Sequence, residues 1–165
     1  MKRKFSILLL VLMLVHVLSG CGFNVPRPEI KKGEFNFSVT YEFDGEIKTI
    51  SGIYVCEYDG IDFVVDGGFR REWKGYVKDN TTEEAILLAT AADGGEIELN
   101  LGFDPDCFMG DANWEGEEPF IPWISVKVVN DEGLYFQNDV DIIAETYGAK
   151  IISYDCDEPI QNTFS

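Results

Sequence analysis

The chain has 165 residues, of which 45% are hydrophobic, and a formal net charge of −17 at pH 7. That length is enough for one globular domain with its own core. Thirty Asp and Glu residues outnumber thirteen Lys and Arg residues, and a chain of this charge is repelled by phosphate backbones. We therefore expect no nucleic-acid binding.

Residues 1–20 predict a secretory signal peptide. Positions 2–4 are basic, positions 5–18 form the apolar run "FSILLLVLMLVHVL", and small residues follow at Ser19 and Gly20. This order of a charged start, an apolar core and small residues is typical of a secretory signal. The apolar run is too short to cross a bilayer, which takes ~20 apolar residues.

The signal ends in "LSGC" at positions 18–21. This motif resembles the lipobox of bacterial lipoproteins. The resemblance implies that Cys21 receives a diacylglyceryl thioether, becomes the first residue of the mature chain, and holds it on the extracytoplasmic face of the bacterial cell membrane. Two acyl chains give the stable anchoring that a single chain does not. The partner implied by this motif is the membrane itself.

The mature chain divides into two parts by composition. Residues 21–33, with two prolines and no hydrophobic period, are interpreted as the lipidated N-terminus and a tether. Residues 34–165 are predicted to form a single β-rich domain, with a net charge of −22 from 29 acids and seven bases. We expect this charge to keep the domain off an anionic bilayer, whereas the basic tether suits one.

Short alternating segments predict strands along most of the domain. Apolar residues occupy every second position in 34–43 and 96–103, and a two-residue turn at Asp44-Gly45 predicts a hairpin. Residues 85–92 are apolar on both sides and are ambiguous between a buried strand and a short helix. The remaining predicted strands are 46–58, 61–66, 69–79, 122–129, 133–137 and 149–156, with a plausible bulge at Gly52 and a turn at Asp59-Gly60.

One helix is predicted near the C-terminus. In 138–148 apolar residues recur at helical spacing, Asn138 or Asp139 can serve as N-cap, and Gly148 follows the last turn. The expected fold is mostly β, an antiparallel β-sandwich or barrel-like domain, with this helix packed as a cover.

The residue types exclude most common hydrolases. The single histidine, His16, lies in the signal, so the mature chain has no Ser-His-Asp or Cys-His arrangement. A pair of carboxylates could still serve a small glycan-active hydrolase, but nothing distinguishes two of the many acids. We predict that the protein is not an enzyme and requires no cofactor.

Three cysteines remain besides Cys21. Their spacing fits no local metal motif. Cys56 lies among apolar residues and is predicted to be a small core residue. Cys107 and Cys156 both lie among acids, and we predict a disulfide between them if the fold brings them together; acidic neighbours make neither a good nucleophile.

The acidic loop at 104–118 is the best candidate for a metal site. Asp111, Asn113 and Glu115 begin like an EF-hand loop, but Pro122 stands where the bidentate glutamate belongs. A Ca²⁺ site of another kind could use Asp104, Asp106, Asp111, Asn113 and Glu115; the alternative is a solvated acidic loop.

The tryptophans suggest a ligand surface. Trp73 and Trp114 are candidates for stacking on a sugar ring, whereas Trp123 is predicted to belong to the core. The preferred function is a non-catalytic binding or adhesion domain for a glycan or protein ligand. The first alternative is an inhibitory or immunity-type lipoprotein that binds a basic partner, and the second is the glycan-active hydrolase.

Overall fold

A computed structural model describes residues 25–65, 68–78, 85–92, 94–111, 118–130 and 133–165. Eight strands and two short helices follow one another in these ranges. They are β1 (Lys32–Phe43), β2 (Glu46–Val64), β3 (Gly68–Val77), β4 (Ala85–Thr90), β5 (Glu96–Phe103), α2 (Pro105–Phe108), β6 (Phe120–Asn130), β7 (Gly133–Gln137), α3 (Val140–Tyr147) and β8 (Ala149–Cys156).

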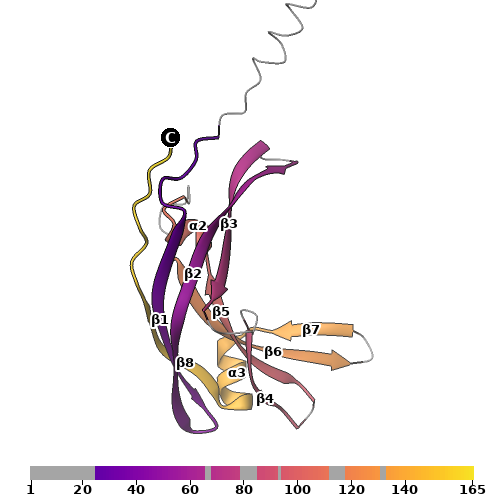
Figure 1. Cartoon of the computed structure of the whole chain (residues 1–165). Helices are drawn as coiled ribbons and strands as arrows, with labels where there is room; N and C mark the ends of the chain where they lie inside the picture. The colour runs from indigo at the N-terminus through magenta and orange to yellow at the C-terminus, as the bar shows by residue number, and fades with distance from the viewer. Residues whose placement is uncertain (1–24, 66–67, 79–84, 93, 112–117, 131–132) are drawn as a thin grey trace, which may run out of the picture.

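The strands form two antiparallel sheets of four. One sheet has the order β3-β2-β1-β8 and the other the order β4-β5-β6-β7, so the chain builds most of one sheet, then the other, and returns to the first with β8 (Figure 1). The expectation of a mostly β, sandwich-like fold is confirmed. Helix α3 lies between the two sheets at one end and contacts both β6 and β8.

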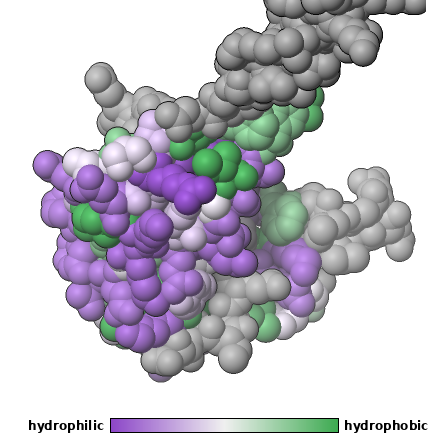
Figure 2. Space-filling model, turned by 45° about the horizontal axis from the view of Figure 1, so that its top comes forward, coloured by the Kyte–Doolittle hydropathy of each residue, from purple (hydrophilic) through white to green (hydrophobic). Residues whose placement is uncertain are grey.

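The core lies between the inner faces of the two sheets. On β1, Phe35, Phe37, Val39 and Tyr41 are buried, and on β5 Ile97, Leu99 and Leu101 are buried. These are the alternate residues that the sequence pattern placed on one face of each strand. Cys56 is also fully buried, as predicted for a small core residue, while most of the face seen in Figure 2 is hydrophilic.

The structure corrects several local predictions. β2 is one strand through Asp59-Gly60, because Gly60, with φ +126°, absorbs a register shift against β3 instead of making a turn. Gly52 holds no bulge in the β1–β2 register; the Phe37 ring packs over it. The ambiguous segment 85–92 forms β4 over 85–90.

Helix α3 begins and ends where the sequence indicated. The side chain of Asp139 accepts hydrogen bonds from the first turn, and Gly148 ends the helix with a left-handed φ of 62°. Ile143 is buried, but Val140, on the predicted apolar face, is 70% exposed. The helix therefore covers only part of the core.

The predicted tether at 21–33 differs from the structure at its C-terminal half. Arg27 and Ser165 exchange two backbone hydrogen bonds, and the backbone N–H of Glu29 donates to the carbonyl of Thr163. The side chain of Asn162 accepts from the backbone N–H of Ile30 and donates to its carbonyl. Lys32 already begins β1. The segment 27–33 is thus part of the domain, held by the last residues of the chain.

No helix among the described residues is long and apolar enough to cross a membrane.

Candidate functional site

Two incompletely paired strands border a groove at one side of the sandwich. Among the described residues, β8 is the last strand of its sheet and pairs only with β1. β6 pairs with β7 only over 126–130, so within the same described ranges its first half, 120–125, has β5 as its one partner strand. Helix α3 lies between them. We call this feature the β6–β8 groove.

The β6–β8 groove is apolar along most of its length. Its cavity has a volume of about 430 Å³, which is in the range of small-ligand and peptide side-chain pockets. The lining residues are Pro122, Trp123 and Ile124 from β6, Val140, Asp141, Ile143 and Ala144 from α3, and Ala149, Lys150, Ile151 and Tyr154 from β8.

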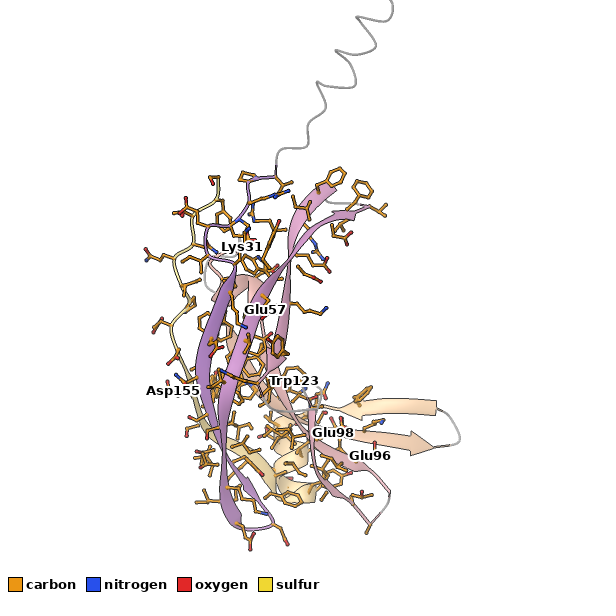
Figure 3. The ribbon with its side chains drawn as sticks, viewed as in Figure 1. Lys31, Glu57, Glu96, Glu98, Trp123 and Asp155 are labelled. Atoms are coloured by element: carbon orange, nitrogen blue, oxygen red, sulfur yellow. The ribbon has the colours of Figure 1, made fainter. Side chains whose placement is uncertain are left out.

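Trp123 is the large aromatic residue of the groove, and it is 44% exposed. Its ring lies against the backbone of Gly102, where an added Cβ would come within 2.4 Å of it. In the β5–β6 ladder Asn100 lies opposite Trp123. Glu98 lies two residues before Asn100 on β5 and therefore on the same face of the sheet as Trp123 (Figure 3). An exposed indole with polar neighbours can stack on a flat apolar surface of a ligand.

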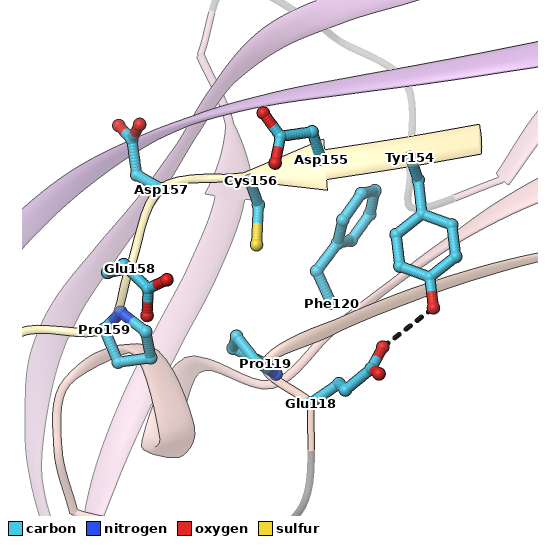
Figure 4. Close-up of a pocket in the computed structure, with 9 residues that line it drawn as sticks. All are labelled: Glu118, Pro119, Phe120, Tyr154, Asp155, Cys156, Asp157, Glu158 and Pro159. Atoms are coloured by element: carbon cyan, nitrogen blue, oxygen red, sulfur yellow. Dashed lines mark hydrogen bonds between the residues drawn. The ribbon is translucent and has the colours of Figure 1, made fainter.

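An acidic pocket continues from the apolar part past Tyr154, which lines both (Figure 4). Its cavity is about 190 Å³. The Tyr154 hydroxyl donates a hydrogen bond of 2.7 Å to Glu118, and this bond raises the pKa of Tyr154. Three more acidic residues contribute to the lining, Asp155, Asp157 and Glu158. The carboxyl groups of Asp155 and Asp157 lie on the other side of the strand from Tyr154 and Cys156 (Figure 4), and that of Asp157 accepts hydrogen bonds from Asn36.

The charge of the whole site is strongly negative. Four acids line the pocket and Asp141 lines the groove. The one cation among the described lining residues, Lys150, forms an ion pair of 2.9 Å with Glu42. Such a surface attracts cationic groups and repels anionic ones.

Cys156 also lines the acidic pocket, but its chemistry is that of an unreactive thiol. Burial and then the charges of Asp155 and Glu158 raise the pKa of Cys156, so little thiolate forms at neutral pH. Cys156 forms no disulfide, and the predicted Cys107–Cys156 bridge is therefore not made in this structure.

Trp73 does not serve as the predicted ligand platform. It is only 6% exposed, and its indole N–H donates a hydrogen bond of 2.7 Å to Asp111. The other candidate, Trp114, lies outside the described residues.

The acidic loop is tied to β3 by Asp111. The guanidinium of Arg71 donates to both carboxylate oxygens of Asp111, whose side chain is 7% exposed. Arg71 also stacks on the Phe164 ring, 4.1 Å from its centroid. Because both oxygens of Asp111 already accept from Arg71 and Trp73, the prediction that Asp111 ligates a metal does not fit this geometry.

The other predicted metal ligands divide into two groups. Asp104 caps α2, accepting from the backbone N–H of Cys107, and Asp106 lies in the first turn of that helix. Asn113 and Glu115 lie outside the described residues. Within the described ranges, no three Asp, Glu, Cys or His side chains come together in a way that could hold a metal ion.

The sequence contained a signal for Trp123 that the prediction missed. Pro122, Ile124 and Val126 alternate along β6 and are all buried, so the period of two places Trp123 on the opposite, outer face. The acidic pocket had no comparable signal, because Glu118 and 155–158 are far apart in the sequence.

Comparison with protein-family models, with curated proteins and with solved structures finds no match for this chain.

Proposed function

We propose that the protein is a membrane-anchored surface lipoprotein whose domain binds, without catalysis, an extended and basic segment of another polypeptide in the β6–β8 groove. The anchor rests on the signal peptide and on the lipobox-like "LSGC" at 18–21. The proposal combines the non-catalytic binding domain preferred from the sequence with the basic partner expected for an inhibitory or immunity-type lipoprotein.

The observation that supports this proposal best is the pair of strand edges. An edge strand presents backbone N–H and C=O groups that an incoming strand can pair with. Peptide-binding domains use such edges for affinity, and use neighbouring pockets to select alternate side chains. β8 and the first half of β6 both face the groove, and apolar pockets lie between them.

The charge of the groove indicates which segment it selects. Apolar side chains would enter the part beside Trp123 and Ile151, and Lys or Arg side chains would reach the pocket at Glu118 and Glu158 (Figure 4). The negative domain would also steer a basic partner toward it and reject acidic ones.

A displayed library of random twelve-residue peptides, panned against the full chain, tests the proposal. We expect the enriched peptides to combine Lys or Arg with alternating apolar residues. Trp123→Ala should weaken their binding about tenfold or more, because a buried aromatic anchor commonly contributes over 1.4 kcal/mol.

Leu87→Ala is the matched control. Leu87 is an exposed apolar residue in the same sheet, on β4, and does not line the groove. Its variant should bind as the parent does. A library that enriches nothing, or peptides that bind Trp123→Ala and Leu87→Ala equally well, would remove the proposed function.

A glycan is the second candidate ligand, favoured by the exposed Trp123 beside Asn100 and Glu98. Two charge variants separate the ligands. Replacing Glu118 and Glu158 together by Gln should weaken a basic peptide and leave a glycan bound, whereas Glu98→Gln should do the reverse.

A further inference from the structure

The β2–β3 hairpin extends beyond the rest of its sheet. β1 begins at Lys32, opposite Glu57, so past Tyr58 the hairpin has no third strand beside it in the part of the chain that the structure describes. Its free end lies at the same end of the molecule as the first described residues and the C-terminus (Figure 1).

The free end of this hairpin carries an exposed apolar cluster. Ile61, Phe63, Val65 and Phe69 form what we call the apolar tip, with Val65 85% and Phe63 56% exposed. Phe63 and Phe69 are paired in register, and their ring centroids are 5.1 Å apart. Figure 2, with this end turned toward the reader, shows apolar surface at the upper edge of the hydrophilic face.

The chain enters the domain beside this hairpin. The backbone carbonyl of Pro26 accepts a hydrogen bond of 3.0 Å from Arg71, and Arg71 pairs with Ile61. Pro26 therefore lies within reach of one arginine side chain of this hairpin, and the first described residues are level with the free end of the hairpin (Figure 1). From Ile61 to Val65 a strand rises ~13 Å at ~3.3 Å per residue.

The proposed lipid anchor has a reach of the same size. Cys21 precedes Pro26 by five residues, which span at most ~18 Å when fully extended. A tether of this reach is long enough for Cys21 and Val65 to lie at the same height. A domain held at Cys21 can therefore have the apolar tip at the membrane surface.

The distribution of charge favours the same orientation. The two segments at this end, 25–33 and 58–74, hold six basic and five acidic residues, Asp62 of the tip among the acids, whereas residues 34–165 as a whole carry a net charge of −22. An anionic bilayer therefore repels the body of the domain more strongly than its nearly neutral anchored end.

We propose that the apolar tip of the β2–β3 hairpin inserts into the membrane interface and forms a second, non-covalent membrane contact beside the lipid anchor. This inference rests on the anchor of the proposed function. Phe63, Val65 and Phe69 would lie ~5–10 Å deep, at the boundary of headgroups and acyl chains, as interfacial apolar groups do. The contact would fix the orientation of the domain and hold the β6–β8 groove in a defined direction.

Tryptophan quenching in vesicles tests this proposal. The full chain with its lipid anchor is reconstituted into phosphatidylcholine and phosphatidylglycerol vesicles whose acyl chains carry bromine, a quencher of indole fluorescence. Phe63→Trp places a probe in the tip, Val65→Trp is a second probe, and Ile47→Trp is the control. Ile47 is 69% exposed and follows the β1–β2 turn, at the opposite end of the molecule (Figure 1).

The added emission of both tip variants should be quenched several-fold more than that of Ile47→Trp. Equal quenching, in a chain that floats with the vesicles, overturns the inserted tip and leaves the anchor standing. A blue shift of the tip emission without bromine quenching overturns insertion in favour of a protein contact, such as a second copy. A chain with intact Cys21 that does not float with vesicles overturns the anchor, and the inserted tip with it.

Discussion

At the scale of single residues, Asp111 connects three parts of the chain that are distant in sequence. It accepts hydrogen bonds from Arg71 and Trp73 on β3, and Arg71 in turn donates to the Pro26 carbonyl and stacks on Phe164. The loop after β5, the N-terminal segment and the C-terminus are thereby joined to the β2–β3 hairpin.

Asp111→Asn should destabilise the fold clearly. The substitution removes the charge that the half-buried Arg71 guanidinium requires, and breaking a buried pair on one side commonly costs several kcal/mol. Because this pair retains some exposure, we expect about 2–3 kcal/mol, or a melting temperature lower by about 6–9 °C for a chain of this size.

Glu34→Gln is the control for that measurement. It removes the partner of Lys78 in an exposed ion pair of 2.9 Å, and such pairs contribute little to stability. Its melting temperature should equal that of the parent. An Asp111→Asn variant that melts with the parent would show that the Arg71–Asp111 pair is not structural.

The tryptophans show what residue-level prediction could and could not supply. The position of Trp123 directly before the apolar run "ISVKVV" predicted a core residue, although the alternation of Pro122 and Ile124 already assigned it to the outer face. The burial of Trp73 depends on Asp111, 38 positions away. No local pattern reveals such a partner.

At the scale of elements, α2 concentrates negative charge in a short turn. Asp104 caps it, Asp106 follows in its first turn, and Asp111 lies just beyond it. Burial, and then the charges of Asp104 and Asp111, raise the pKa of Asp106 above its ordinary 3.8. The folded chain therefore holds this proton more strongly than the unfolded chain.

Asp106→Asn should accordingly stabilise the protein at neutral pH. The contribution of a carboxyl with a raised pKa is fully present at low pH and is lost as the pH rises from about 4 through its folded pKa. The neutral amide of Asn does not titrate and avoids this loss of stability. The melting temperature of the Asp106→Asn variant should therefore exceed that of the parent at pH 7 and match it near pH 3.5. An equal or lower melting temperature at pH 7, with Asp62→Asn as the surface control, would contradict this reading.

The strands themselves were largely predictable, and their edges were not. Alternation along β1 and β5 identified both the strands and their buried faces, because a period of two is a local property. That β7 covers only half of β6, and that β8 returns to the edge beside β1, are consequences of long-range pairing. The β6–β8 groove depends on both, and so no segment of sequence predicts it.

At the scale of the whole molecule, the fold separates two surfaces by its core. The β2–β3 hairpin and the N-terminal segment share one end (Figure 1), whereas the β6–β8 groove opens at the side bordered by β8 and α3. An anchored protein of this form would present its groove to molecules outside the cell membrane.

Calcium should have no measurable effect on this fold. The carboxylate of Asp111 already accepts hydrogen bonds from Arg71 and Trp73, so the acidic loop lacks one of its predicted calcium ligands. The melting temperature of the full chain in chelator and in millimolar Ca²⁺ should be the same. Saturating binding at 100 times the dissociation constant would add ~2.7 kcal/mol, so a rise of roughly 8 °C would restore the calcium site that the sequence suggested.

Hydrogen exchange of the full chain, with and without an enriched basic peptide, tests the central claim most directly. If the peptide adds as a strand, the amides of one of the two edges, β8 or the 120–125 half of β6 apart from Pro122, should exchange more slowly when it is bound. The edge strands β4 and β7 provide the internal control and should be unchanged. Protection that appears equally on all edge strands, or on none, would contradict strand addition in the β6–β8 groove.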